Sequence, residues 1–396
     1  MLLSEVLIDI FRLDSEPFQK IYLNKFNTLN IKKLSEIAIC NPGKSEISKL
    51  DNNTNVSFVP MASLGSGIIN QKQDGIINDY KAAGYTYFYE NDILIAKITP
   101  CMEHGKCAIA RGLTNNIGFG STEYNVFRVN NNDILTEYLF VFLNRENIRK
   151  NAEINMIGTS GRQRVPIAFY ENLLIPIPSL DFQHTIKKLI DKSYNNHTRS
   201  HALYTQAEDL LLSTLGLHNF TPRTDNITIK NITESFLKSG RLDAEYYQPK
   251  YEEMEEKIKE HPFELLGDLV TIKKSIEPGS DAYSDEGLPF IRVSDYNKFG
   301  IAKAEKCLSS SFCNEKANLL PSLYPTKDTI LFSKDGSIGI AHKVREDMQA
   351  ITSGALLHLK VKDETKVLPD YLTLVLNSNF VQLQAERDAG GSIIKH

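Results

Sequence analysis

The sequence predicts an α+β protein in which two copies of one mixed unit are joined by a long helix. Three observations support this prediction. The pentapeptide RLDSE at 12–16 returns as RLDAE at 241–245, which is 229 residues later. Short apolar runs, broken by glycine, asparagine and aspartate, are typical of strands. One stretch of about 35 residues repeats its apolar side chains at helical spacing.

Further landmarks follow both copies of the pentapeptide in the same order. They are Phe58 and Phe290, the segments 92–95 and 328–331 with Lys97 and Lys334 after them, Ser121 and Ser353, the segments 137–144 and 370–377, and the pairs 158–159 and 391–392. This ordered agreement indicates a duplicated fold. Because the side chains between the landmarks differ, the two copies should present different surfaces.

The composition is that of an ordinary globular protein. A chain of 396 residues, 41% hydrophobic and 24% charged, has the length for two or three domains. We expect neither a membrane span nor a secretory signal, because the apolar runs are short and the amino terminus has no basic region. Five cysteines without a regular framework indicate a reduced, cytoplasmic protein. The net charge of −4 argues against a histone-like polyanion binder but allows a local basic groove.

The first unit is expected to span residues 1–178 and to begin with a helix. Within 1–30, apolar residues recur at helical spacing at Val6, Leu7, Ile10 and Phe11. Four apolar runs predict strands, at 56–59, 93–98, 126–129 and 173–177. One helix is expected from Tyr138 to Lys150. Gly118-Phe119-Gly120 is a lone G-x-G and predicts a structural turn.

A helical spacer is expected at 179–262. Ser179 or Asp181 can cap a helix whose apolar stripe continues to Leu215. At 1.5 Å per residue this helix would be about 50 Å long, and a run of that length is usually a coiled-coil arm. The polar residues 218–232 indicate a linker.

A second, charged helix is expected at 245–260, and the second unit then spans 263–396. By analogy with the first unit, the second should continue into a strand and long helix of its own after Ile394. Either the chain is truncated or a partner supplies that helix.

No catalytic constellation is recognisable in the sequence. It has neither a G-x-x-x-x-G-K-[ST] phosphate loop nor the Asn/Asp-Pro-Pro-aromatic tetrapeptide of amino-methyltransferases. Cys101, His104 and Cys107 have metal-like spacing, but a structural zinc site usually needs four ligands and the second unit has no counterpart. We therefore expect no metal.

The loop at 158–164 is the first candidate for DNA contact. It contains Arg162, Gln163 and Arg164. Arginine can bond both O6 and N7 of guanine, and glutamine can bond N6 and N7 of adenine. A solvated surface loop is the alternative interpretation. The equivalent segment of the second copy also begins with glycine and a hydroxyl residue and ends at a cation, Lys395, which favours a function.

A second candidate pair follows the strand that precedes each lysine landmark. Lys97 and Thr99 enter a loop in the first copy, and Lys334 and Ser337 do so in the second. Rigid scaffolds present polar side chains from such loops, although solvated lysines are equally compatible with the pattern. Arg292 and Ser294 are weaker candidates of the second copy.

The order of these features resembles the specificity subunits of type I restriction–modification systems. The motifs that carry the resemblance are IPIP at 175–178, Gln183 at the start of the long helix, and RLDAEYY at 241–247 followed by Gln248-Pro249. The resemblance covers nearly the whole chain. It implies that each unit is a target recognition domain for one half of a split site in double-stranded DNA, with a helical spacer between them.

The resemblance also implies partners. Methyltransferase subunits would dock on the spacer, and restriction/translocase subunits would join through the complex. This chain would be non-catalytic, with no cofactor and no membrane contact, because S-adenosylmethionine, ATP and magnesium would bind to the partner subunits. The family pairs two long helices antiparallel, and the sequence here contains one of them.

Three alternatives stay open. The chain could serve a type II system with a fused or separate nuclease–methyltransferase, which differs in its partners alone. It could be a protein–protein scaffold whose paired domains bind peptides, in which case no salt-dependent DNA binding is expected. It could be an enzyme in its own right, which the motif search disfavours.

Overall fold

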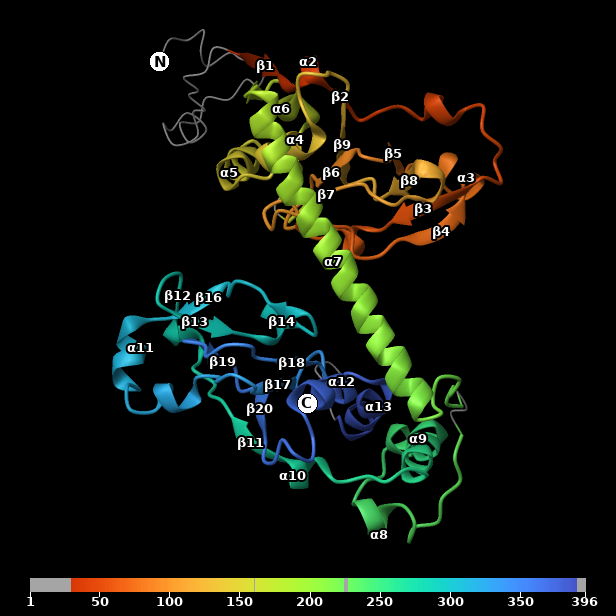
Figure 1. The fold of residues 1–396 in the computed structure, drawn as a ribbon, viewed down its shortest axis with the longest axis vertical. Coiled ribbons are helices and arrows are strands. Elements are labelled where there is room, and N and C mark those ends of the chain that lie inside the picture. Colours follow the sequence, from red (N-terminus) through yellow and green to blue (C-terminus); the bar gives the residue numbers. More distant parts are fainter. Residues whose placement is uncertain (1–29, 160, 224–226, 390–396) are drawn as a thin grey trace. The chain divides into compact units, whose positions relative to one another are not determined.

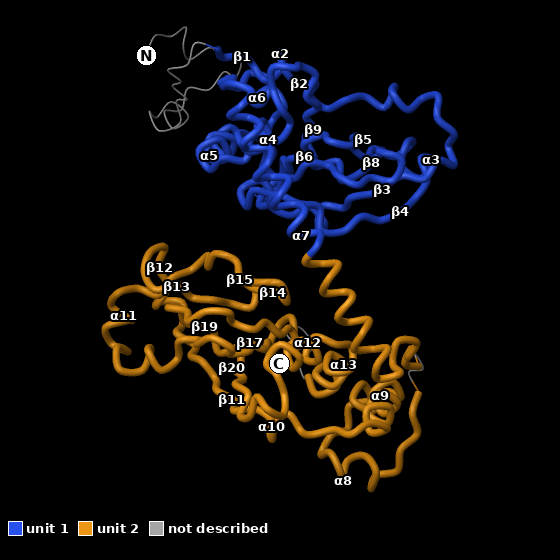
Figure 2. The backbone as a smooth tube through the Cα atoms, viewed as in Figure 1, with its two compact units in different colours: residues 1–199 blue, residues 200–396 orange. Residues whose placement is uncertain are grey.

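The computed structural model describes residues 30–159, 161–223 and 227–389. The chain divides into two compact units, residues 1–199 and 200–396 (Figure 2). The helix expected within 1–30, the first copy of the pentapeptide, and Lys395 lie outside the described residues. The domain boundaries expected at 178 and 262 stay a prediction.

Among its described residues, the first unit contains two four-stranded sheets and one two-stranded sheet (Figure 1). Their strand orders are β2-β9-β6-β7, β4-β3-β8-β5 and β1-β10. The strands are β1 Ile31–Lys33, β2 Ala38–Cys40, β3 Asn55–Val59, β4 Gln73–Ile76, β5 Thr86–Tyr89, β6 Ile93–Ala96, β7 Cys107–Ile109, β8 Ile117–Gly120, β9 Tyr124–Val129 and β10 Leu174–Pro176. The helices are α2 Leu34–Ile37, α3 Ile77–Lys81, α4 Thr136–Leu143, α5 Glu146–Ile154, α6 Ile167–Glu171 and α7 Leu180–Thr214, with short 3₁₀ turns η3 Lys44–Ile47, η4 Met61–Ser63 and η5 Thr114–Asn116.

Strand β6 lies at the centre of the first unit, because both of its faces are buried. Ile93 and Ile95 pack into the core that includes helices α4 and α5. Leu94 and Ala96 pack into the core between the two larger sheets. Successive side chains of a strand point to opposite faces, so the continuous apolar run at this position builds a layered helix–sheet–sheet unit.

The second unit repeats the first sheet with the same strand order. Its sheets are β11-β20-β17-β18, β12-β16-β13-β19 and β14-β15. The strands are β11 Val270–Lys274, β12 Tyr283–Ser284, β13 Leu288–Ile291, β14 Tyr296–Asn297, β15 Gly300–Ile301, β16 Lys306–Leu308, β17 Ile330–Ser333, β18 Ala341–Lys343, β19 Ile351–Thr352 and β20 Leu356–Val361. The helices are α8 Phe236–Ser239, α9 Pro249–Lys259, α10 Leu266–Leu269, α11 Ser310–Glu315, α12 Pro369–Leu376 and α13 Asn379–Asp388, with 3₁₀ turns η6 Ala244–Tyr247, η7 Ser280–Ala282, η8 Val293–Asp295 and η9 Leu320–Leu323.

Strand pairing confirms the duplication and corrects its alignment by one residue. Ile93 pairs with Phe127 in β9, and Ile330 pairs with Leu359 in β20. Ile93 therefore corresponds to Ile330, and the sequence alignment of 92–95 with 328–331 is one residue out of register. A one-residue shift would exchange the two faces of the strand. The lysine landmarks Lys97 and Lys334 are correctly matched.

The helix expected from Tyr138 to Lys150 is instead two helices, α4 and α5. Arg145 has an extended backbone, with φ −61° and ψ 141°. This conformation interrupts the i to i−4 hydrogen bonds of a helix and starts a new one. The second unit has the same break at Ser378, with φ −72° and ψ 154°.

The lone G-x-G is strand rather than turn, so that prediction is wrong. Gly118 and Gly120 lie in β8, fully inside the unit. A Cβ atom on Gly118 would lie 2.0 Å from Cε2 of Phe88, and one on Gly120 would lie 2.6 Å from the carbonyl oxygen of Val59. Glycine is required here because neighbouring groups approach too closely for a side chain.

The long helix is confirmed as α7, within one residue of the expected ends. At its start, Gln183 is buried and anchors the helix to the first unit. Its amide donates to the carbonyl oxygens of Asp133 at 2.9 Å and Pro178 at 3.0 Å, and its oxygen accepts from the Leu135 N–H at 2.8 Å. In the described parts of the chain, no helix is long and apolar enough to cross a membrane.

The helix expected at 245–260 begins later than predicted. A 3₁₀ turn, η6, covers Ala244–Tyr247, and the α-helix α9 starts at Pro249. Gln248 between them has an extended backbone, which residues before proline favour. Proline is well suited to the first position of a helix because it has no N–H to satisfy.

Candidate nucleic-acid interface

In the first unit the fold brings the two predicted loop segments together. The N–H of Val165 donates to the carbonyl oxygen of Lys97 at 2.9 Å, and the N–H of Thr99 donates to that of Gln163 at 3.1 Å. The two segments are more than 60 residues apart in sequence, yet they run side by side directly after β6. The candidate side chains of the first unit therefore form one cluster.

Arg164 forms an ion pair with Glu123, a residue that the sequence did not indicate as part of the site. Its Nε and Nη2 atoms bind the two carboxylate oxygens of Glu123 at 2.8 and 2.7 Å. Its third nitrogen, Nη1, donates to the carbonyl oxygen of Arg162 at 3.2 Å. The hydrogen bond from Arg164 lowers the pKa of Glu123, and the charge of Lys97 lowers it further. This forked pair fixes the loop geometry, so contact between Arg164 and a base stays a prediction.

The remaining candidates of the first unit differ in their access to solvent. Arg162 is exposed, whereas Lys97, Thr99 and Gln163 are half-buried. The Thr99 hydroxyl is buried, and the described residues provide no hydrogen-bond partner for it. The geometry therefore favours Arg162 and Gln163 over Thr99 for contact with a ligand.

In the second unit, acidic neighbours hold two of the candidate cations. Arg292 binds Asp295 at 3.3 Å and Glu305 at 2.6 Å, and Lys334 forms an ion pair with Asp335. Ser294 and Ser337 are exposed. The two loops are neighbours, because a Cβ atom on Gly336 would lie 4.0 Å from Cγ1 of Val293. Lys395 cannot be placed, since it lies beyond the described residues.

Lys97 and Lys334 occupy equivalent positions in the two units. The N–H of Lys97 donates to the carbonyl oxygen of Glu123, and that of Lys334 donates to the carbonyl oxygen of Ala355, both at 2.9 Å. Glu123 and Ala355 are themselves equivalent by strand register. The backbone hydrogen bond is thus the same in both units, whereas the acidic Glu123 of the first unit is replaced by Ala355 in the second.

The metal-like spacing of Cys101, His104 and Cys107 does not form a ligand set. Cys107 belongs to β7 and is buried in the core, and burial raises the pKa of its thiol to about 12. Across the residues for which the structure gives positions, no three histidine, cysteine, aspartate or glutamate side chains gather as metal ligands.

Comparison with known sequences shows which family shares these features. The sequence model described as the type I restriction modification DNA specificity domain matches residues 26–208. This part of the chain is similar to a type I restriction specificity domain. The matched range includes the first-unit candidates, the loop pair and most of α7, whereas the second-unit candidates lie outside it.

Two curated proteins from Escherichia coli are similar to this chain. The type I restriction enzyme EcoAI specificity subunit is 35% identical over 218 residues, which are 52% of this chain and 34% of that protein. The EcoEI specificity subunit is 30% identical over 261 residues, which are 63% of this chain and 41% of that protein. The matches thus span well under half of the length of these relatives.

Two solved structures, an S subunit and an HsdS subunit, are also similar to this chain, at low sequence identity. The S subunit of a type I restriction–modification system from M. genitalium has a TM-score of 0.37 and 12% identity, covering 92% of this chain and 80% of that one. The HsdS subunit from Thermoanaerobacter tengcongensis has a TM-score of 0.33 and 17% identity, covering 92% and 84%.

Proposed function

We propose that this chain is the DNA-specificity subunit of a type I restriction–modification complex and that it recognises a bipartite, asymmetric duplex site. The observation that carries the proposal is the duplicated loop position at Lys97 and Lys334, which has the same backbone but different polar surroundings. One fold used twice suits a duplex with two half-sites. Different side chains at equivalent positions imply different half-site sequences.

In this proposal the chain directs the complex to its DNA site and catalyses no reaction itself. Methyl transfer, DNA cleavage and translocation would belong to methyltransferase and restriction subunits, which would also bind S-adenosylmethionine, ATP and magnesium. A type II system would give the chain the same role with other partners. A peptide-binding scaffold is the alternative of a different class.

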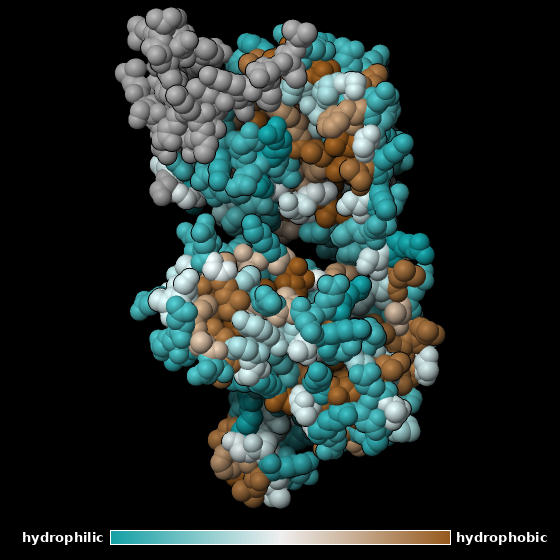
Figure 3. Space-filling view, turned by 60° about the vertical axis from the view of Figure 1, so that its left-hand side comes forward, coloured by the Kyte–Doolittle hydropathy of each residue, from teal (hydrophilic) through white to brown (hydrophobic). Residues whose placement is uncertain are grey.

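The methyltransferase subunits would dock on α7. The surface in Figure 3 is mainly hydrophilic, with separate hydrophobic patches, and α7 contributes its own apolar positions to the exposed surface. Those at heptad spacing are Phe182, Leu189, Leu203 and Leu210. Asn196 occupies the remaining position of this stripe, and a single polar residue in such a stripe can specify the register of helix packing.

We expect binding of the assembled complex to specific duplex DNA to weaken steeply with salt. Each phosphate neutralised by lysine or arginine releases counterions, so affinity should fall by on the order of a thousandfold between about 50 and 200 mM salt if roughly six phosphates are contacted. Titration of a duplex with the native site would measure this. Affinity that is flat with salt, or equal for random duplexes, would favour the scaffold.

We expect Arg162→Ala together with Gln163→Ala to change preference in one half-site. A lost bidentate base contact costs about 1–3 kcal/mol at one base pair, whereas a lost phosphate contact weakens all sequences alike. Lys334→Ala with Ser337→Ala should act on the other half-site. Selection of bound duplexes from a randomised pool would show both effects, with Arg199→Ala on α7 as the control for a lost positive charge.

Parallel loss at both half-sites in either double variant would contradict one unit per half-site. Arg164→Ala should behave differently from Arg162→Ala, because it frees the Glu123 carboxylate and thereby adds an unpaired negative charge to the proposed interface.

A further inference from the structure

A short hairpin of the second unit reaches α7. Strands β14 and β15 pair Tyr296 with Ile301 and Asn297 with Gly300, which leaves Lys298 and Phe299 at the tip. The base of the hairpin is fixed, because the hydroxyl of the buried Tyr296 donates to the carbonyl oxygen of Ile340 at 2.8 Å. The tip is shaped by the Phe299 N–H, which donates to the Asn297 side chain at 2.8 Å.

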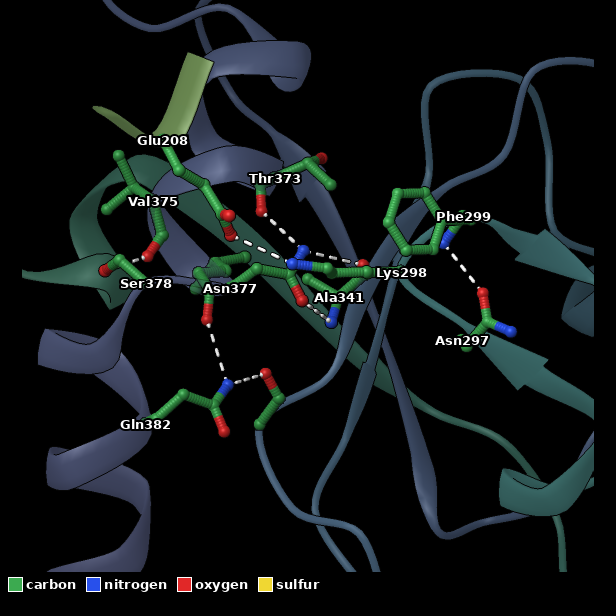
Figure 4. A network of polar contacts seen from close by, with 12 residues as sticks. Glu208, Asn297, Lys298, Phe299, Ala341, Thr373, Val375, Asn377, Ser378 and Gln382 are labelled. Carbon is green, nitrogen blue, oxygen red and sulfur yellow. Dashed lines mark hydrogen bonds and ion pairs between the residues drawn. The ribbon is translucent and has the colours of Figure 1, made fainter. Parts of the chain in front are cut away.

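Both residues of the tip contact the helix. The Lys298 ammonium lies 3.0 Å from Oε1 of Glu208 (Figure 4). It also lies 4.2 Å from the centre of the Tyr204 ring. The Phe299 ring lies 3.9 Å from the His201 ring and edge-on to Tyr204 at 5.2 Å, centre to centre. Burial raises the pKa of Tyr204 to about 12, so its ring stays neutral and attracts the cation. We call these contacts the Lys298 clamp.

The clamp rests on a rigid part of the second unit. The Asn377 amide donates to the carbonyl oxygens of Ala341 at 2.8 Å and Thr373 at 2.9 Å, and its oxygen accepts from the Ala341 N–H at 3.0 Å (Figure 4). Strand β18 and helix α12 are therefore held together directly beside the hairpin. A change in the hairpin tip should leave this framework intact.

The first unit contacts α7 with the same chemistry but from a different loop. The Arg111 guanidinium lies 5.0 Å from the centre of the Tyr194 ring and binds Asp191 at 2.7 Å and Glu137 at 3.0 Å. Arg111 follows β7, and the residue at the equivalent distance after β18 is the exposed Arg345. The two contacts therefore do not descend from one duplicated position, which indicates that each unit needs such a contact independently.

We propose that the Lys298 clamp is a positioning device that fixes the second unit to its own half of α7 and so restricts the spacing at which the second half-site is accepted. This inference rests on the proposed function. Ring stacking, cation–π attraction and an ion pair restrict rotation about the helix more strictly than apolar contact alone, because each requires a defined direction. Lys298 acts through the unit that it holds and makes no contact with DNA itself.

The test compares Lys298→Met, Lys298→Arg and Lys303→Met in the full complex. Lys303 is an exposed cation just after the same hairpin and controls for the lost charge. Duplexes would carry the native half-sites at the native spacing or at one base pair more or less. In Lys298→Met the preference for the native spacing should fall roughly fivefold, as expected for a partly desolvated cation–π contact. Lys298→Arg should retain it.

A local readout separates positioning from folding. Amide hydrogen exchange at 296–301 should quicken in Lys298→Met and not in Lys303→Met, while β17 and β20 stay protected. Phe299→Ala should relax the spacing preference in the same way. Unchanged spacing preference in both tip variants would overturn the clamp, whereas a wild-type complex that prefers no bipartite duplex would overturn the proposed function instead.

Discussion

Replacing Leu189, Leu203 and Leu210 with aspartate is expected to abolish binding of the methyltransferase subunits. These side chains are 61%, 52% and 68% exposed, so the chain itself does not need them buried. In a helix–helix interface each carboxylate would be desolvated without a partner, which costs several kcal/mol per ion. An affinity loss of at least about a thousandfold follows, since each factor of ten is about 1.4 kcal/mol. Co-purification and titration with the methyltransferase subunit would measure it.

A matched variant separates docking from added charge. Asn195→Asp, Ala202→Asp and Thr205→Asp place three carboxylates at exposed positions outside the leucine stripe of the same helix. This variant should bind the methyltransferase subunit nearly as the wild type does. Equal binding by the leucine variant would show that the partner docks elsewhere. Both variants should keep the amide protection of β6 and β17, because the stripe lies outside both cores.

Helical periodicity predicts the length of α7 but does not show which of its leucines are exposed. The ends of α7 are predictable because apolar side chains recur at three- and four-residue steps along its whole length. Leu210 and Leu211 both fit the apolar stripe of the helix. From the sequence alone, either could be chosen as a docking residue to replace with aspartate. In the structure Leu211 is 8% exposed and therefore buried, whereas Leu210 is 68% exposed. Its replacement would therefore damage the fold as well as any docking surface.

The loop cluster is predictable in part, for a similar reason. The repeat places Lys97 and Lys334 after equivalent strands, and the structure confirms that match. The pairing of 97–99 with 163–165 depends on backbone hydrogen bonds, which no side-chain pattern specifies. The Arg164–Glu123 pair joins residues 41 positions apart, and in the second copy alanine stands where Glu123 does. Because this ion pair occurs in one copy only, comparing the two copies of the repeat cannot reveal it.

Irregular backbone is the other part that the sequence leaves open. The alternation of Ile93, Leu94 and Ile95 between two cores looks like a plain apolar run, so its register can slip by one residue in an alignment. The break at Arg145 falls within a stretch whose residue types all suit a helix. Pro249, by contrast, does signal the late start of α9, because proline and its preceding residue restrict the backbone.

Arg128→Met is expected to destabilise the first unit by about 3–5 kcal/mol, the cost of leaving one partner of a buried ion pair unpaired. The Arg128 guanidinium binds both oxygens of Asp92, at 2.7 and 2.6 Å, and also contacts Glu46. The Asp92 carboxylate is 1% exposed. Burial raises the pKa of Asp92 even with Arg128 beside it. Without Arg128, the ionised carboxylate would remain in the core with the Tyr89 N–H, at 2.7 Å, as a hydrogen-bond donor.

The pH dependence of this variant has a definite sign. An acid whose folded pKa lies above its unfolded value costs nothing while both states are protonated, and its cost grows as the pH rises through the unfolded pKa, about 3.9 for aspartate, towards the folded one. The stability difference between Arg128→Met and the wild type should therefore be smallest at acidic pH and largest near neutrality. Denaturant unfolding, with hydrogen exchange at β6 and β9 to report on the first unit, would follow it.

The repeat supplies the control for this experiment. Lys360 occupies the position in β20 that Arg128 has in β9, and Thr329 replaces Asp92. Lys360 is exposed and donates to the Thr326 hydroxyl at 3.1 Å, so Lys360→Met should change stability by less than about 0.5 kcal/mol. Asp92→Asn added to Arg128→Met removes the buried charge and should restore part of the loss. If the double variant is no more stable than Arg128→Met, the loss comes from the packing of the arginine side chain against Tyr87 and Tyr89, and the buried charge is not its cause.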